Sequence, residues 1–196
     1  MLIDAIRCGH TELAQRLVDD GVVVNGNLDL DYCTNLTSLP KGLVVKGWLD
    51  LEGCTSLMSL PEGLVVNGDL DISGCAGLAL LPEGLVVNDF YLTGCTGLTS
   101  LPKGLVVNGN IYLCGCTSLT SLPDGLVVKG YLWLSGCTGL TSLPEGLVVK
   151  GDLSLSGCTN LTSLPDGLVV RGYISLYGCT EELRADARRK GFDYYD

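Results

Sequence analysis

Cysteines are the side chains with the most evident chemistry in this chain, because thiols can form disulfides, bind metals or act as nucleophiles. Ten cysteines occur in 196 residues, and eight of them recur at steps of 21 residues with one step of 20: Cys33, Cys54, Cys75, Cys95, Cys116, Cys137, Cys158 and Cys179. No pair of CxxC motifs accompanies them, and neighbouring side chains that leave a stack in one direction have poor disulfide geometry. We therefore expect a ladder of buried, reduced thiols without metal or cofactor, and Cys114 is the one candidate for a reactive thiol.

Acidic and aromatic residues are the second set that could carry function, because they vary between repeats that are otherwise nearly identical. The first four repeats gather seven acidic residues: Asp29, Asp31, Asp50, Glu52, Asp69, Asp71 and Asp89. Aromatic residues at equivalent positions are Trp48, Tyr91, Tyr112, Tyr131, Trp133, Tyr173 and Tyr177. Carboxylates about 5 Å apart suit a retaining glycosidase, whereas clustered tyrosine and tryptophan are anchors in protein interfaces.

These residues are positioned by a repeat with the pattern LxLxGCTxLTSLPxGLVVxGx. A unit of 21 residues is too short to enclose its own core, so neighbouring units must stack and bury their leucines against one another. One repeat lacks a residue, because a glycine is missing from the segment Asn88-Asp89-Phe90. The sequence thus predicts a β-rich solenoid of parallel strands with about eight coils and short helical caps at both ends.

The alternation of residues fixes which side chains face outward. In the segment from Tyr131 to Ser135 the period is two, so Leu132 and Leu134 point inward while Trp133 points outward. We expect one strand per coil, near Leu28, Leu49, Leu70, Phe90, Ile111, Leu132, Leu153 and Ile174. The Leu-Pro-x-Gly step predicts a turn with a left-handed glycine, the following Leu-Val-Val is expected to be extended, and x-Gly forms a second corner.

The two ends depart from the repeat, as the ends of a solenoid must if they are to cover its edges. Residues 1–24 are predicted to form an N-terminal helical cap, and residues 25–180 form the solenoid. Residues 181–196 are predicted to form a C-terminal helical cap with an acidic aromatic tail. Thr180 suits the first capping position of that helix, and Gly191 suits its end.

The motif LxLxGCTxLTSLPxGL, over roughly residues 28–179, resembles the leucine-rich repeats of plant intracellular immune receptors and of bacterial effectors with a Leu-Pro step. This resemblance implies a recognition module that holds its ligand on the strand face. The usual first leucine of LxxLxLxx is replaced, for example by Asn67, Lys129 and Arg171, so a straighter, β-helix-like coil is an alternative to a curved horseshoe. Residues 5–21 resemble the helical pair of an ankyrin repeat, in which His10 would brace a turn.

Composition narrows the choice of partner. A formal net charge of -10 argues against nucleic acid, because phosphate backbones are bound by clustered lysine and arginine. No apolar run approaches the roughly 20 residues that cross a bilayer, and the first residues do not have the pattern of a secretory signal. We therefore expect a protein of the cytoplasm, or one delivered into a host cytoplasm, that binds neither nucleic acid nor membrane.

The leading functional hypothesis is a protein-interaction module, such as an effector or inhibitor, rather than an enzyme. Its acidic and aromatic strand face would bind a basic or mixed segment of a protein partner. The alternative is a carbohydrate-binding or carbohydrate-active solenoid in which a pair such as Asp50 and Asp71 acts as acid and base, but nothing in the sequence raises one pKa selectively. Calcium binding by the aspartates, and a homodimer through the aromatic face, stay open.

Overall fold

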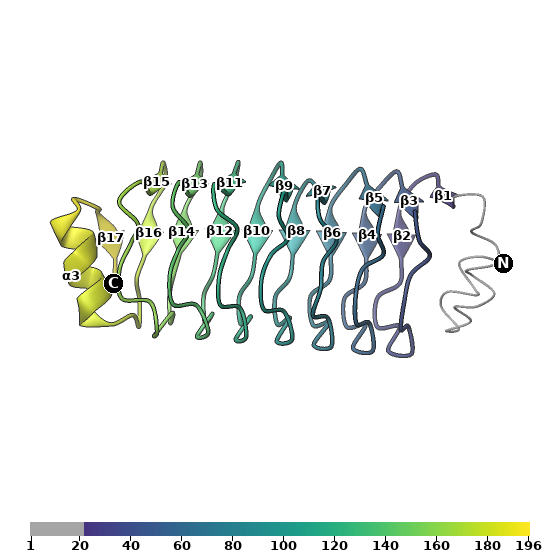
Figure 1. Ribbon diagram of the computed structural model, residues 1–196, viewed down its shortest axis with the longest axis horizontal. Helices are drawn as coiled ribbons and strands as arrows, with labels where there is room; N and C mark the ends of the chain where they lie inside the picture. Colours follow the sequence, from purple (N-terminus) through teal and green to yellow (C-terminus); the bar gives the residue numbers. More distant parts are fainter. Residues whose placement is uncertain (1–21) are drawn as a thin grey trace.

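Residues 22–196 are described by a computed structural model, in which the repeats form a row of stacked coils (Figure 1). Each coil contributes two strands of two residues, and all strand pairs are parallel. The first strand of each coil begins at an inward apolar residue: β2 (Leu28–Asp29), β4 (Leu49–Asp50), β6 (Leu70–Asp71), β8 (Phe90–Tyr91), β10 (Ile111–Tyr112), β12 (Leu132–Trp133), β14 (Leu153–Ser154) and β16 (Ile174–Ser175). The predicted solenoid and its eight strand positions are confirmed.

The Leu-Val-Val segments form a second row of strands, as the sequence predicts. These valine strands are β1 (Val23–Val24), β3 (Val44–Val45), β5 (Val65–Val66), β7 (Val86–Val87), β9 (Val106–Val107), β11 (Val127–Val128), β13 (Val148–Val149) and β15 (Val169–Val170). They make two sheets, β1-β3-β5 and β7-β9-β11-β13-β15. The break lies between β5 and β7, just before the segment with the missing glycine, where Asn88 N donates to Gly68 O, whereas Asn67 N in the preceding coil donates to Val45 O. The missing residue therefore shifts the register there.

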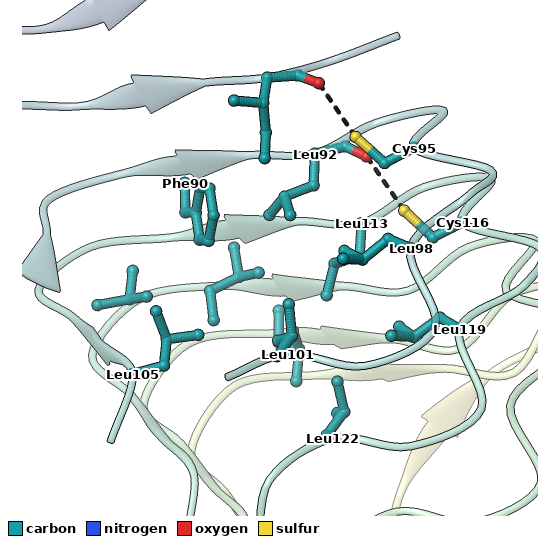
Figure 2. Packing of buried hydrophobic residues seen from close by; sticks show 14 of the residues in the cluster. Phe90, Leu92, Cys95, Leu98, Leu101, Leu105, Leu113, Cys116, Leu119 and Leu122 are labelled. Carbon is teal, nitrogen blue, oxygen red and sulfur yellow. Dashed lines mark hydrogen bonds between the residues drawn. The ribbon is translucent and has the colours of Figure 1, made fainter. Parts of the chain in front are cut away.

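Leucines fill the interior of the stack, and the period-two register is confirmed. Leu132 is completely buried, whereas the next residue, Trp133, keeps 42 % of its surface exposed. Phe90 replaces a leucine in the fourth coil and is fully buried. Figure 2 shows how equivalent side chains of successive coils, such as Leu92 and Leu113, lie one above the other. Each buried leucine contributes about 1.5–3 kcal/mol relative to an exposed one, so stability accumulates coil by coil.

The cysteine ladder is also a hydrogen-bond ladder. Each buried thiol donates to a backbone carbonyl of the preceding coil, as Cys95 Sγ does to Ile72 O at 3.0 Å and Cys116 Sγ to Leu92 O at 3.1 Å (Figure 2). All nine cysteines of the described residues are thiols. Burial raises the pKa of the Cys116 thiol to about 11, so it is un-ionised at neutral pH. One expectation is wrong: Cys33 is only half-buried, because it belongs to the first coil of the described stack.

Two kinds of glycine shape each coil. Gly63, in the Leu-Pro-x-Gly turn, has φ +72° and confirms the predicted left-handed turn. Gly68, in the x-Gly corner, does not have a left-handed φ, but a Cβ there would lie 2.8 Å from Gly47 C and 2.9 Å from Gly47 O. The corner needs glycine because successive backbones approach too closely for any side chain.

The C-terminal end is covered by the predicted helix, α3 (Glu181–Arg189), which lies at the end of the row (Figure 1). The Thr180 side chain accepts a hydrogen bond from Leu183 N at 3.3 Å, as expected of an N-cap. Beyond Gly191 the tail forms a strand that the sequence did not predict, β17 (Tyr194–Tyr195), which pairs with β16. The nine-stranded sheet therefore runs from β2 to β17. The predicted N-terminal helices, with Cys8 and His10, lie outside the described residues.

Candidate functional site

The outward surface of the nine-stranded sheet, here called the strand face, carries the predicted partner-binding residues. None of these fourteen side chains is buried. Seven are exposed: Asp29, Asp31, Trp48, Tyr131, Trp133, Tyr173 and Tyr177. Seven are half-buried: Asp50, Glu52, Asp69, Asp71, Asp89, Tyr91 and Tyr112. The parallel register places equivalent residues of successive coils side by side, so that they form columns along the stack.

Aspartates of the first three coils stand directly opposite one another. The register pairs Asp29 with Asp50 and Asp50 with Asp71. Burial raises the pKa of Asp50 most strongly, and the charges of Asp71 and Asp29 raise it further, against the opposing effect of the hydrogen bond from Glu52 N. Like charges opposite each other on neighbouring strands destabilise a sheet by a few tenths to about 1 kcal/mol per pair.

Many of the same carboxylates also hold the backbone, a role that sequence reasoning missed. Asp50 Oδ1 accepts a hydrogen bond from Glu52 N at 2.9 Å, and Asp71 Oδ1 accepts one from Ser73 N at 2.8 Å. In the neighbouring column of the strand face, Asp89 Oδ1 accepts a hydrogen bond at 2.7 Å from Asn110 N, which belongs to the following coil. A short side chain with an acceptor oxygen therefore organises the ends of these strands, and its negative charge is an addition that the hydrogen bond does not need.

We expect Asp50→Asn to stabilise the protein by about 0.5–1 kcal/mol at neutral pH, because the amide oxygen keeps the hydrogen bond and the repulsion disappears. The wild-type carboxyl has a raised pKa in the folded state, so its ionisation opposes folding. The advantage of the variant should therefore vanish as the pH falls through that raised pKa. Thermal melts at several pH values measure this difference.

The control is Asp152→Asn. Asp152 Oδ1 also accepts a backbone hydrogen bond, although from the next coil, at Tyr173 N and 2.8 Å, and its column neighbours are Tyr131 and Tyr173 rather than acids. Its replacement should change stability by less than about 0.5 kcal/mol. Equal stabilisation by both variants would show that repulsion along the aspartate column is not the cause.

Aromatic residues follow the aspartates in the same column. The rings of Tyr91 and Tyr112 are stacked, with centroids 4.6 Å apart and an interplanar angle of 5°. The ring of Tyr112 meets Trp133 edge-on at 5.2 Å. Burial, together with the charge of Asp89, raises the pKa of Tyr91 to about 12, so its hydroxyl stays neutral. The ladder is pre-formed, since neighbouring rings already pack against one another.

A groove of about 240 Å³ lies where the aspartates of the strand face give way to its aromatic residues. It is lined by Leu49 and by two aromatic and three acidic side chains: Trp48, Tyr91, Asp50, Asp69 and Asp71. We call it the acidic groove. The sequence predicted all five of these side chains as binding residues, and the fold brings them together. Sequence reasoning missed Tyr32 nearby, which replaces the glycine of the Gly-Cys-Thr turn, and its hydroxyl donates to Glu52 Oε1 at 2.6 Å.

A second groove, of about 360 Å³, lies toward the C-terminal end of the strand face. We call it the serine groove, because its floor contains Ser135, Ser154 and Ser175. Its other lining residues are Trp133, Asp152, Leu153, Tyr173 and Tyr195. Ser135 and Ser154 hydroxyls are hydrogen-bonded at 2.8 Å.

Sequence reasoning missed the serine groove because Tyr195 reaches the sheet only through β17. Its ring lies 5.1 Å from that of Tyr173. Ser154 and Ser175 follow Tyr112 and Trp133 in the same column of the strand face. Two successive small residues leave a gap between large side chains, and this was the signal from which the groove could have been predicted.

Within residues 22–196, no three acidic, cysteine or histidine side chains come together in an arrangement that could hold a metal ion. Cys114 is half-buried on the strand face, beside the fully buried Cys116. No helix in the described part of the chain is both long and apolar enough to cross a membrane.

The fold and its surface define a parallel β-solenoid repeat protein with an acidic and aromatic strand face. Comparison of the chain with models of protein families, with curated proteins and with solved structures finds no match.

Proposed function

We propose that this protein is a recognition module of the leucine-rich-repeat kind, and that its strand face binds a protein partner through a basic segment. The acidic groove carries the proposal, because three carboxylates line it together with the aromatic rings of Trp48 and Tyr91. An arginine or lysine side chain can interact favourably with both the acidic and the aromatic side chains of this groove. Its cation attracts carboxylates and also lies favourably over an aromatic face.

The pre-formed arrangement of the face favours recognition. The carboxylates are oriented by hydrogen bonds to the backbone, and the rings of the aromatic ladder stack on one another, so little conformational entropy is lost on binding. A net charge of -10 would also steer a basic partner toward the protein. The ladder of buried thiols supports a cytoplasmic location, including the cytoplasm of a host, since reduced cysteines are typical of that compartment.

The test uses a synthetic peptide in which arginine alternates with leucine, and a counterpart in which glutamate replaces arginine. We expect the arginine peptide to bind and the glutamate peptide not to bind. The double variant Asp50→Lys with Asp71→Lys should slow association about 10-fold or more and weaken its salt dependence, because peripheral charges act mainly on the association rate. Trp133→Ala should instead speed dissociation about 30-fold if the ring is an anchor worth about 2 kcal/mol. Stopped-flow or surface-binding kinetics separate the two effects.

A double variant of the C-terminal cap and tail, Glu182→Lys with Asp193→Lys, makes the same change of net charge away from the strand face. Both side chains are exposed. It should retain most of the association rate. Unchanged binding by a variant that lacks both Trp133 and Tyr112 would exclude the aromatic ladder from the site and confine the site to the acidic groove, which neither residue lines.

The serine groove favours a second candidate function, carbohydrate binding. Aromatic walls stack against sugar rings, and the serine hydroxyls and the Asp152 carboxylate offer hydrogen bonds to sugar hydroxyls. A glycan array probed with wild-type protein and with Trp133→Ala discriminates between the candidates. Sugar binding that depends on Trp133, without binding of the arginine peptide, would replace the first proposal with the second.

A further inference from the structure

A column of outward valines runs the length of the stack on the valine strands, apart from the strand face. It contains one residue per coil: Val23, Val44, Val65, Val86, Val106, Val127, Val148 and Val169. Six of the eight keep between 43 % and 49 % of their surface exposed. A continuous apolar stripe is unusual on a protein surface that meets only water.

Charged residues of opposite sign flank this column in the last three complete coils. Three residues before each valine, the turn carries an acid: Asp124, Glu145 and Asp166. Two residues after each valine, the corner carries a base: Lys129, Lys150 and Arg171. All six side chains are exposed. Each level thus presents acid, valine and base in the same order.

Most of these charges have no ionic partner in the part of the chain that the structure describes. Within residues 22–196, no ion pair forms at Asp124, Glu145, Lys150 or Arg171. Lys129 Nζ donates to the neutral Asn108 Oδ1 at 2.7 Å. Asp166 alone is paired, with Lys190 Nζ at 2.8 Å.

In a dimer with a twofold axis parallel to the stack, the valines and the flanking charges would both find matching partners. Such an axis keeps every coil at its own level and reverses the direction of the strands. The valine columns of two copies then face each other, and the acidic edge of one copy meets the basic edge of the other. A twofold axis along the strands would instead place acid against acid, so the charges select one arrangement.

We propose that two copies of this chain associate through the valine column, with their stacks parallel and with the last three complete coils forming salt bridges between copies. Glu145 of each copy faces Lys150 of the other, and Asp124 faces Lys129. The contact weakens toward the N-terminal coils. There Val44 is flanked by Lys41 and Lys46, so that like charges of the two copies would face each other. The strand face stays open on both copies, so the dimer presents two acidic grooves.

The dimensions of the column predict a weak dimer. Eight levels at about 4.8 Å span about 34 Å, and five residues at about 3.3 Å span about 16 Å. The contact therefore buries roughly 1,000 Å² in total, near the lower limit for a specific interface. A second copy fits this surface better than an unrelated chain does, because only a repeat of equal period matches valine to valine at every level.

The experiment uses two variants of the full chain. In each variant, the residues that flank the valine column at positions 124, 129, 145 and 150 all have charges of one sign. The first is Lys129→Glu with Lys150→Glu, and the second is Asp124→Lys with Glu145→Lys. We expect the wild type to dimerise as its concentration rises in sedimentation equilibrium. Each variant alone should dimerise about 100-fold more weakly, because like charges then face each other. An equimolar mixture should form heterodimers with close to wild-type affinity.

Thermal melts check that both variants fold. A variant with Val148→Cys provides a second measurement, because a residue on the twofold axis meets its own copy and should form an intermolecular disulfide under mild oxidation. A wild type that stays monomeric at every concentration would overturn the proposal. So would variants that dimerise unchanged alone, or dimerisation that is lost in Trp133→Ala, which would place the contact on the aromatic ladder.

Discussion

Gly68→Ala is expected to destabilise the protein by about 3 kcal/mol or more, because overpacking against atoms that cannot move is among the costliest single changes. The added Cβ would meet the backbone of the preceding coil, with Gly47 C at 2.8 Å and Trp48 N at 2.9 Å. These atoms belong to the hydrogen-bonded stack, in which Gly68 N donates to Gly47 O at 3.0 Å. Relief of the clash therefore requires neighbouring coils to separate.

Two other glycine variants separate steric contact from backbone conformation. A Cβ at Gly84 would have no atom within 4 Å, but the residue has φ +69°, so Gly84→Ala should destabilise the protein by about 1 kcal/mol. Gly167→Ala has neither feature, since its nearest neighbour lies at 3.8 Å, and should change stability by less than about 0.5 kcal/mol. Chemical denaturation measures all three. Equal costs for the variants at Gly68 and Gly84 would show that the close approach of the backbones does not limit the corner.

Asp186→Ala is expected to release the C-terminal cap at a cost of about 3 kcal/mol, because it removes one member of a buried charged network. Asp186 is the one charged residue in the described part of the chain that is buried, with 5 % of its surface exposed. Its Oδ2 accepts a hydrogen bond from Leu164 N at 2.8 Å, and ion pairs join it to Lys190 and Arg189. The carboxylate thus connects α3 to the last complete coil.

The same carboxylate makes the cap sensitive to acid. Burial by itself would raise the pKa of Asp186, but the hydrogen bond from Leu164 N and the cations of Lys190 and Arg189 outweigh burial and lower it. A folded-state pKa below the unfolded value contributes stability above the unfolded pKa, which is lost as the pH falls through the lowered value. The wild-type cap should therefore loosen only below pH about 4, the ordinary range of an aspartate.

Hydrogen exchange of α3 and of the last coil is the appropriate measurement, because coils of a solenoid interact mainly with their neighbours. Exchange should accelerate there in Asp186→Ala and stay unchanged near β4. Asp186→Asn should have a smaller effect, since its amide oxygen still accepts from Leu164 N. The exposed Asp193→Ala is the control and should leave exchange unaffected. Uniform acceleration along the whole chain would show that the cap is not a separate element.

The strand-face aspartates combine a structural and a recognition role, and the two roles have different requirements. The structural role needs only an acceptor oxygen at the right distance, which asparagine supplies equally well, as Asn110 Oδ1 does for Tyr131 N at 2.8 Å. The negative charge at Asp50 is therefore not needed for the hydrogen bond and opposes folding. A cationic ligand would offset that repulsion, which is why the acidic groove supports the proposed function more strongly than the aromatic ladder does.

The sequence by itself determined the coil, its register and its outward columns. A repeat of 21 residues cannot enclose a core alone, so stacking follows from its length, and alternation along segments such as Leu132-Trp133-Leu134 decides which side chains reach that core. The left-handed glycine turns and the C-terminal helix, with Thr180 at its start, also follow from local residue preferences. These features depend on neighbours in the chain, so a single sequence contains the information.

Only the tertiary structure decided how separate coils meet. The hydrogen bond from Asn110 N to Asp89 and those from the cysteine thiols join residues more than 20 positions apart, and the acidic groove requires three coils in register. The tail joins the sheet because the edge of β16 is free to pair, a condition that no pattern near Tyr195 signals. The same holds for the valine column, whose exposure depends on where the whole coil turns and not on its apolar sequence.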